Sequence, residues 1–269
     1  MTKLDGNAPA DSTYVADQYK DASKLDARLR LYKLYEEPGR PSFFRWVFDA
    51  IEFPRAAKVL EVGAGVGSFW FENAERIPAD ADIVVSDNSP PMLETARAKL
   101  DDPRMRFERV DVQQIGYPEA SFDVVIANHM LYHAPDRPGA LRELARVLRP
   151  GGRLYATTNC WTHLIELRAL IEQFAPGAHV LPARYLADAF DAETGARELQ
   201  QIFRSVRIRN RRSKLEVTDA SHLLDYVRST LSNPAGFREP DMQRHLEWLI
   251  ELQGDFYLSL AAALFIAVR

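Results

Sequence analysis

The chain has 269 residues, of which 46% are hydrophobic and 27% charged, and its formal net charge at pH 7 is −4. These values are typical of a soluble globular protein, and the weak negative charge disfavours a broad nucleic-acid-binding surface. The only cysteine is Cys160, which excludes an internal disulfide and a cysteine-based metal site. The start of the chain lacks the apolar core of a signal peptide, and residues 256–268 are too short for a membrane-spanning helix, so we expect a cytoplasmic protein.

The first fifty residues predict two helices. Residues 23–37 carry Leu and Tyr at helical spacing and end at a Pro-Gly pair, and residues 43–51 form a second helix dense in aromatic side chains. These aromatics either pack onto a sheet domain or form a lid over a ligand. Tyr14 and Tyr19 are the candidates for lid contacts. The segment suits a homodimer contact equally well.

Residues 58–70, KVLEVGAGVGSFW, predict a ligand-binding turn. A branched apolar run indicates a buried parallel strand, and Gly63, Gly65 and Gly67 then break it before a helix begins. Glycines bring backbone N–H groups close to a ligand, and the helix N-terminus adds partial positive charge. The pattern therefore indicates a nucleotide-type site at the carboxyl end of a strand. A buried carboxylate is costly unless it is paired, so Glu61 is expected to anchor something.

The second strand, residues 82–86, ends at Asp87, and this position follows the glycine loop by about twenty residues. A carboxylate here can accept hydrogen bonds from both ribose hydroxyls of a nucleoside, and a helix cap or turn is the alternative role. Asn88 is grouped with it as a ligand contact. Met92, in the next helix, is assigned to an adenine face or to core packing.

The third and fourth strands add polar residues at the same edge. Asp111 follows the strand at residues 105–109, where its carboxylate can accept from an adenine amino group while a neighbouring backbone N–H, such as that of Val112, serves the ring nitrogen. The fourth strand, residues 121–128, ends at Asn128, and His129 comes directly after it.

The series VLEVGAGVG, Asp87, Asp111-Val112, FDVVIANHMLYH and LRPGG resembles the class I S-adenosyl-L-methionine (SAM)-dependent methyltransferases, and its wording is similar to bacterial enzymes acting on small molecules. The resemblance covers about residues 58–158. It implies an α/β fold with a Rossmann-like, seven-stranded, mostly parallel sheet and an antiparallel last strand, plus a helical N-terminal lid and helical inserts. Strands six and seven are expected at residues 206–217 and 263–269. It implies SAM as cofactor, with Gly63, Gly65, Gly67, Asp87 and Asp111 as its contacts and Asn128 and His129 near its methionine part. The candidate cofactor-binding residues also include Tyr19, Glu61, Asn88, Met92 and Val112.

The expected organisation has three parts. Residues 1–50 form an N-terminal helical lid segment, residues 51–160 the SAM-binding core, and residues 161–269 the acceptor-pocket helices and C-terminal strands of the same domain. In this fold class the inserts build the acceptor pocket, so substrate choice is assigned to residues 12–50, 158–190 and 219–255.

SAM carries a methyl group on a cationic sulfur, and methyl transfer is an in-line displacement in which the protein orients the acceptor and excludes water. An O–H or N–H acceptor also needs a base, for which His is the natural choice. His133 is the first candidate, and His163 the second, because Glu166 at i+3 could couple to it. No metal site is expected. Arginines between residues 207 and 214 indicate a solvated strand face, with an RNA or anionic acceptor as the alternative.

We therefore expect a SAM-dependent methyltransferase that acts on a small molecule in specialised metabolism, with no nucleic-acid or membrane partner. The alternatives are an RNA or protein methyltransferase, a protein of this fold that binds SAM without methyl transfer, and an NAD-dependent oxidoreductase. The last is disfavoured by Ser68, which replaces the third glycine of the dinucleotide fingerprint, and by Asp111.

Overall fold

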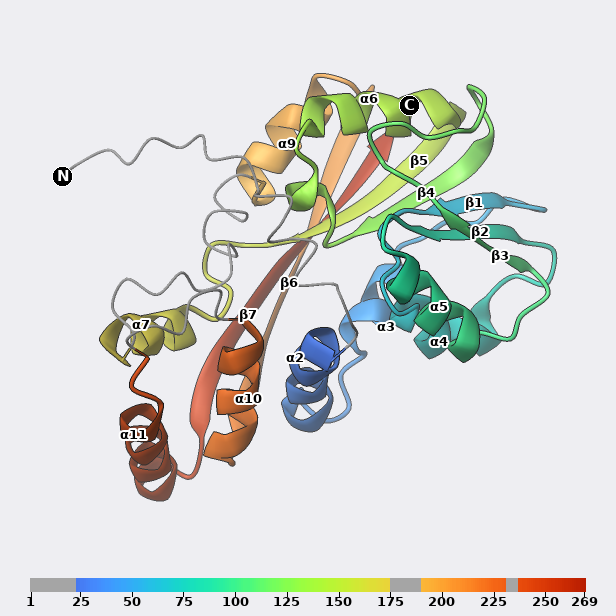
Figure 1. The fold of residues 1–269 in the computed structure, drawn as a ribbon. Helices are drawn as coiled ribbons and strands as arrows, with labels where there is room; N and C mark the ends of the chain where they lie inside the picture. The colour runs from blue at the N-terminus through green and yellow to red at the C-terminus, as the bar shows by residue number, and fades with distance from the viewer. Residues whose placement is uncertain (1–22, 175–189, 231–236) are drawn as a thin grey trace.

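The apolar runs of the sequence form the strands of one twisted sheet (Figure 1). The computed structural model describes residues 23–174, 190–230 and 237–269. The strands lie in the order β3-β2-β1-β4-β5-β7-β6. Neighbours among β1 to β5 pair in parallel, whereas β7 runs antiparallel to both β5 and β6, which confirms the predicted fold class. The strand bounds are β1 Lys58–Glu61, β2 Asp82–Asp87, β3 Met105–Arg109, β4 Phe122–Asn128, β5 Leu148–Asn159, β6 Ser205–Val217 and β7 Phe256–Val268.

Local signals set many of the helix ends. Asp136 begins one helix by accepting from the Gly139 N–H at 2.9 Å, Asp191 begins another through a capping box, and Gly254 ends the last with φ of 92°. The described helices are α2 Ser23–Tyr35, α3 Phe43–Phe48, α4 Ser68–Asn73, α5 Pro90–Lys99, α6 Arg137–Val147, α7 Ile165–Phe174, α9 Ala192–Gln200, α10 Ala220–Thr230 and α11 Glu239–Gln253, with 3-10 turns η1 Ala74–Arg76 and η2 Leu131–His133.

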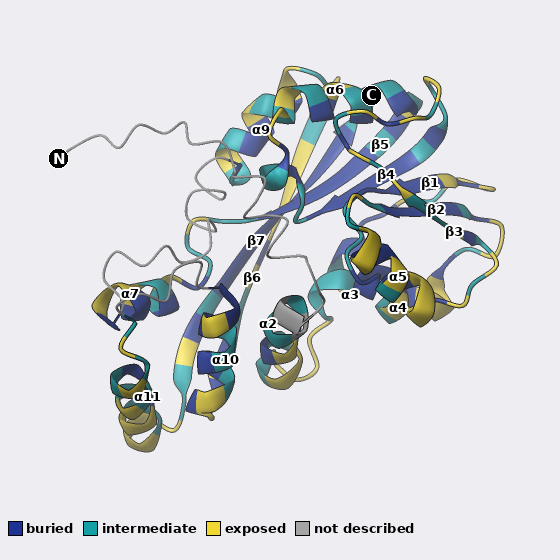
Figure 2. Cartoon of the chain, in the orientation of Figure 1, coloured by how far each residue is buried: buried dark blue, intermediate teal, exposed yellow. Residues whose placement is uncertain are grey.

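Two apolar layers cover the parallel part of the sheet (Figure 2). On one face α6 and α9 pack on the sheet through residues such as Leu144 and Leu199. On the other face α3 and α4 do so through residues such as Val47 and Trp70. This double covering buries the central strands, as a parallel sheet requires.

The last two strands are longer than predicted and carry a third core. The expected strand at residues 263–269 begins instead at Phe256, because β7 pairs along the whole of β6, from Val217 beside Phe256 to Ser205 beside Val268. The ends of β6 and β7 near Val217 and Phe256 project away from β1 to β4 (Figure 1). There α2, α7, α10 and α11 pack around them in one cluster. The predicted helical inserts therefore build a wall beside the carboxyl ends of the parallel strands.

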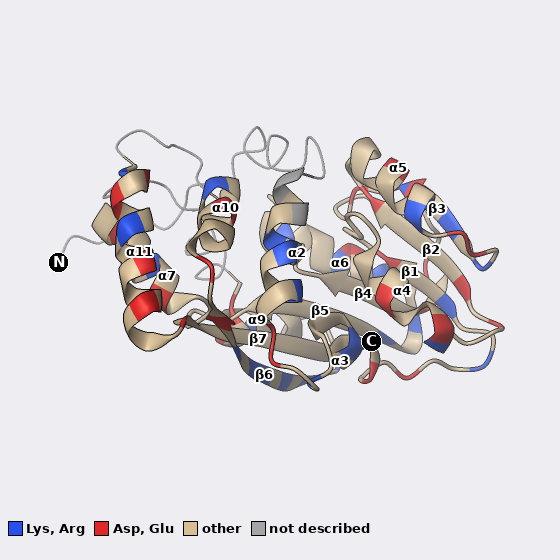
Figure 3. Ribbon diagram, turned by 90° about the horizontal axis from the view of Figure 1, so that it is seen from below, with Lys and Arg blue, Asp and Glu red and all other residues tan. Residues whose placement is uncertain are grey.

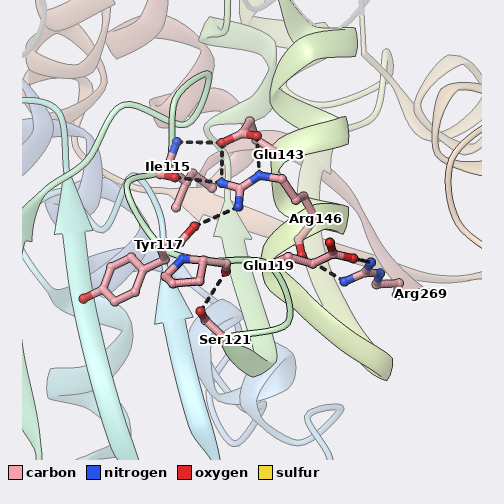
Figure 4. A network of polar contacts seen from close by, with 8 residues as sticks. Ile115, Tyr117, Glu119, Ser121, Glu143, Arg146 and Arg269 are labelled. Carbon is pink, nitrogen blue, oxygen red and sulfur yellow. Dashed lines mark hydrogen bonds and ion pairs between the residues drawn. The ribbon is translucent and has the colours of Figure 1, made fainter.

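One guanidinium fixes the connection between β3 and β4 (Figure 4). Arg146 of α6 donates to the carbonyl oxygens of Ile115 and Tyr117, both at 2.8 Å, and pairs with Glu143 at 2.6 Å. The Ile115 N–H donates back to Glu143 at 2.9 Å. Arg269, at the chain end, donates to the Arg146 carbonyl at 2.9 Å. These bonds hold the side of the sheet remote from the glycine loop.

The described helices include none that is both long enough and apolar enough to cross a membrane.

Candidate functional site

The glycine loop has the tight turn that the sequence predicts. Gly63, Gly65 and Gly67 all have positive φ, at 66°, 56° and 74°. Gly63 and Gly65 line a large cavity, whereas Gly67 does not. A Cβ on Gly67 would lie 2.7 Å from Leu100 Cδ1, so this third glycine allows the start of α4 to pack closely against the end of α5.

Asp87 holds the glycine loop and faces the cavity at the same time. One carboxylate oxygen accepts from the Gly65 N–H and the other from the Ser89 N–H, both at 2.8 Å. Burial raises the pKa of Asp87, and these backbone hydrogen bonds oppose the rise. The side chain lines the cavity, so a role in the turn and a role toward a ligand are compatible in this geometry.

Glu61 is buried at the end of β1, with one carboxylate oxygen bonded and one not. The Asn128 amide donates to Oε1 at 3.5 Å, and the Thr157 hydroxyl donates to the other end of that amide at 3.2 Å. Among the described residues Oε2 has no hydrogen-bond partner. Burial raises the pKa of Glu61 to about 8, and the side chains of Trp70 and Asn128 oppose the rise. An orphaned buried oxygen beside the glycine loop fits a ligand that donates a hydrogen bond there.

Of the residues predicted for the adenine end, three line the cavity and Met92 does not. Asp111 and Val112 both line the cavity, and the Asp111 carboxylate accepts from the Gln113 N–H at 2.9 Å. Asn88 also lines it. Met92 is 1% exposed and does not line the cavity, so the structure supports the core-packing interpretation and not contact with an adenine face.

The lid residues Tyr14 and Tyr19 lie outside the described residues. The predicted helix over residues 43–51 ends at Phe48, and residues of α3 pack in the sheet core as the first interpretation expected. Phe43 nevertheless lines the cavity, and its ring centroid lies 4.8 Å from that of His129.

Three histidines line the cavity wall: His129, His133 and His163. Burial lowers the pKa of the first two to about 4 and that of His163 to about 3. All three rings are therefore neutral near pH 7. The backbone of His129 has φ of 50°, and its N–H donates to the Thr157 carbonyl and hydroxyl at 3.2 and 3.1 Å. This unusual conformation places the ring at the tip of β4.

His163 does not couple to Glu166, contrary to the prediction. Glu166 accepts instead from the N–H and hydroxyl of Ser259 at 2.8 and 2.5 Å, which ties α7 to β7. His163 Nδ1 accepts from the Ala261 N–H at 3.2 Å, and Nε2 lies 3.0 Å from the Tyr32 hydroxyl. Both ring nitrogens are occupied, so this geometry leaves His163 without a free lone pair for a base. His133 stays a prediction.

The cavity has a volume of about 1720 Å³, larger than a typical ligand pocket of roughly 300–1,000 Å³. It extends from the glycine loop to a chamber between α2, α7, α10 and β7. Sequence reasoning assigned these segments to the acceptor pocket but missed their individual residues. The missed lining residues include Leu25, Arg28, Tyr32, Leu167, Tyr226 and Leu260. Helical spacing in residues 23–37 was the one signal that could have marked Tyr32.

Basic residues recur along β6 (Figure 3), but only part of them form a solvated face. Arg207, Arg209 and Arg212 are exposed, as the preferred interpretation expected. Arg211 is buried, pairs with Glu36 and donates to the carbonyl of residue 41 at 2.6 Å. It ties the α2–α3 connection to β6 because its partners come from that connection.

No group of three or more His, Cys, Asp or Glu side chains gathers into a metal site within residues 23–174, 190–230 and 237–269.

Known proteins match the part of the chain that holds the glycine loop. Residues 60–156 match the family described as "Methyltransferase domain". The chain is 43% identical over 103 residues to 27-O-demethylrifamycin SV methyltransferase of Amycolatopsis mediterranei, covering 36% of each protein. It is 31% identical over 114 residues to the ubiquinone/menaquinone biosynthesis C-methyltransferase of Idiomarina loihiensis, covering 41% of the chain and 45% of that protein. The chain thus spans less than half the length of these curated relatives.

The fold is also that of solved structures. Phosphoethanolamine N-methyltransferase 2 of Haemonchus contortus, in complex with SAM, superposes with a TM-score of 0.60 at 16% identity, over 96% of this chain and 59% of the other. That likeness concerns the fold alone. The family match, the glycine loop and the sheet order together show a methyltransferase domain of the class I, SAM-dependent type at residues 60–156.

Proposed function

We propose that the protein transfers the methyl group of SAM to a small-molecule acceptor. The observation that carries this proposal is the continuity of one cavity, whose wall includes the glycine loop and acidic residues at one end and the α2, α7, α10 and β7 chamber at the other. A cofactor at the glycine loop and an acceptor in the chamber would share one continuous space. That arrangement suits direct transfer of a group between two molecules held side by side.

At the cofactor end, backbone groups of Gly63 and Gly65 approach SAM closely because no side chain intervenes. The Asp87 carboxylate receives the ribose hydroxyls, and Asp111 the adenine amino group. Glu61 supplies its free oxygen to a hydrogen-bond donor of the ligand. Asn128 and His129 lie beside the methionine part, at the tip of β4.

When bound, SAM supplies a methyl group on a cationic sulfur. The chain orients the acceptor in line with that bond and excludes water, and the aliphatic side chains of the chamber favour an apolar acceptor body. His133 is the proposed base or orienting group. Its pKa of about 4 makes the ring a weak proton acceptor, so it suits an acceptor that is acidic or that needs only orientation.

The net charge of −4 supports a small-molecule acceptor over RNA. The likeness to the rifamycin methyltransferase supports a place in specialised metabolism. The division into a lid segment at 1–50, a SAM-binding core at 51–160 and acceptor-pocket elements at 161–269, and a cytoplasmic location, belong to the same proposal.

Calorimetric titration with SAM, S-adenosylhomocysteine and NAD tests the cofactor site. Asp87→Ala removes the acceptor of the Gly65 and Ser89 N–H groups, so we expect binding of both sulfur nucleosides in the wild type and its loss in this variant. Asp101→Ala, an exposed aspartate away from the cavity, is the matched control. Binding of NAD alone, or of neither sulfur nucleoside, would contradict the proposal.

A further inference from the structure

Acidic and basic side chains gather at opposite ends of the cavity. Among the described lining residues, the end at the glycine loop has four acidic side chains and two basic ones. The chamber elements α2, α7 and β6 contribute two acidic side chains, one of which, Glu36, is paired with Arg211. Their basic side chains are Arg28, Arg30, Lys33, Arg168 and Arg211. A cavity with this charge distribution suits a cationic cofactor at one end and an anionic group at the other.

Arg28 lies in the aromatic part of the chamber. It lines the cavity and precedes Tyr32 by four residues on α2, so the two side chains share one face of the helix. Burial raises the pKa of Tyr32 and of Tyr226 on α10, and the positive charge of Arg28 opposes the rise. Burial lowers the pKa of His133, and the charge of Arg28 adds to that effect. The guanidinium is therefore near both hydroxyls and near the proposed base or orienting group.

A series of hydrogen bonds begins at a backbone group of β7. The Ala261 N–H is an obligatory donor and points at Nδ1 of His163 at 3.2 Å. Since burial keeps this ring neutral, the other nitrogen, Nε2, carries the hydrogen. Nε2 lies 3.0 Å from the Tyr32 hydroxyl and donates to its oxygen. The hydroxyl hydrogen of Tyr32 must then be directed to another acceptor.

The series ends at Tyr226. α2 and α10 lie side by side (Figure 1), and the rings of Tyr32 and Tyr226 pack edge-on with centroids 6.3 Å apart. The Tyr32 hydroxyl donates to the oxygen of Tyr226. Because that oxygen accepts from Tyr32, the hydrogen of the Tyr226 hydroxyl is the last of the series. Tyr226 lines the cavity, so it can offer this hydrogen to a ligand beside the Arg28 guanidinium.

We propose that the Tyr226 hydroxyl and the Arg28 guanidinium together bind a carboxylate group of the methyl acceptor. This proposal rests on the proposed function, because it takes the occupant of the chamber to be the acceptor. Two donors, one of them charged, match the two oxygens of a carboxylate. A guanidinium has five N–H donors, so it can serve a ligand and a protein group at once. Tyr226 and Arg28 are then specificity-determining residues, and His163 and Tyr32 are positioning residues.

Benzoate and benzamide test the two donors, because the probes have the same shape and differ in charge. Both are titrated at pH 7 into protein saturated with S-adenosylhomocysteine, and binding is followed by NMR. We expect the wild type to bind benzoate about tenfold more tightly, as for one hydrogen bond to a charged group. Arg28→Met should remove this preference by weakening benzoate alone, and Arg28→Lys should keep part of it. Tyr226→Phe should weaken both probes about threefold to tenfold, because the amide also has an oxygen.

Two variants on α2 are matched controls. Arg30→Met removes the same charge two residues away, at an exposed position where water and salt screen it. Tyr35→Phe removes a hydroxyl that lies 2.7 Å from His222 Nδ1, and neither of these two residues lines the cavity. Both variants should change the affinity for benzoate by less than about twofold.

Equal affinity of the wild type for the two probes, including failure to bind either, would overturn the proposal. So would the same loss in Arg30→Met as in Arg28→Met, or unchanged binding in Tyr226→Phe. Binding of S-adenosylhomocysteine itself reports separately on the proposed function. Loss of that binding refutes the cofactor assignment, whereas cofactor binding without preference for benzoate refutes only the carboxylate site.

The tautomer of His163 gives a second readout that needs no probe. In protein labelled with ¹⁵N-histidine, the signal absent from His163→Gln identifies this ring. We expect a neutral ring protonated at Nε2 at pH 6, in the wild type and in Tyr226→Phe alike, because the Ala261 N–H sets the tautomer. A ring protonated at Nδ1, or a charged ring, would overturn the direction of the series and with it the donor role of Tyr226.

Discussion

Replacing Glu61 by Gln should make the protein without its cofactor more stable and its cofactor binding weaker. Glu61 is 1% exposed, and its Oε2 has no partner among the described residues. Gln has almost the same shape and keeps an oxygen for the Asn128 amide, which lies 3.5 Å from Oε1. The substitution therefore changes the charge and the donor pattern at one buried point and leaves the packing of β1 intact.

The expected size follows from the pKa. Folding raises the pKa of Glu61 from 4.5 to about 8, so between these pH values the folded chain binds more protons than the unfolded chain. The free energy of unfolding contributed by this group is then lost as the pH rises through the window. At pH 7 the loss relative to pH 4 is about 3 kcal/mol, from about 1.4 kcal/mol for each of roughly 2.5 pH units. Glu61→Gln should recover most of it.

Urea unfolding between pH 5 and pH 8 measures this free energy, as the difference in stability between Glu61→Gln and the wild type at each pH. The difference is needed because three buried histidines, His129, His133 and His163, have the opposite pH dependence. Their contribution to the free energy of unfolding falls as the pH drops below about 6.5. Glu75→Gln, an exposed carboxylate, should change stability by less than about 0.5 kcal/mol at every pH.

In the same variant, SAM should bind about tenfold to a hundredfold more weakly, because one hydrogen bond to a charged acceptor is lost. A stability difference that does not grow with pH would refute the assigned burial of this carboxyl. Unchanged SAM affinity would refute its role toward the ligand.

Two further substitutions test packing that the site depends on. Gly67→Ala puts a residue with a side chain at positive φ and places its Cβ 2.7 Å from Leu100 Cδ1. It should lower the free energy of unfolding in urea by about 2–4 kcal/mol. A loss below about 1 kcal/mol would contradict the close approach of α4 and α5. Arg211→Met leaves Glu36 without its buried partner and should lower the free energy of unfolding by about 3 kcal/mol in a thermal melt. Arg209→Met, at an exposed position of the same strand, should lower it by less than about 0.5 kcal/mol. Equal losses would show that Arg211 does not fasten the α2–α3 connection.

The sequence predicted most where function and local structure coincide. One turn requires positive φ at Gly63 and Gly65 and a carboxylate, that of Asp87, at the end of β2. These requirements fix glycine and aspartate at set spacings, which can be recognised in the sequence. The seven-stranded sheet and its antiparallel last strand came with the resemblance to a family. Chain order and residue type were sufficient for these features because neither depends on which distant side chain packs against them.

The features that escaped prediction depend on contacts between distant parts of the chain. His163 and Glu166 are three residues apart, which suggested a pair. In the fold each bonds to β7 instead, one at Ala261 and the other at Ser259. Arg211 looked like any exposed arginine of β6, yet it is buried because α2 and α3 return over that part of the strand. Helical spacing could place Tyr32 on a face of α2 but not show what that face meets.

The electrostatics of the cavity wall explain why so many titratable groups can line one space. At neutral pH the three histidines carry no charge, and Glu61, with a pKa of about 8, is mostly protonated before a ligand binds. The cause is the same in each case, because burial disfavours the charged form of acid and base alike. A cation such as a sulfonium would then meet neutral imidazoles instead of repelling charges, and Glu61 beside it could ionise in response. Burial of these four groups thus lowers the stability of the protein without a ligand, and it gives the site a wall that suits a cationic cofactor.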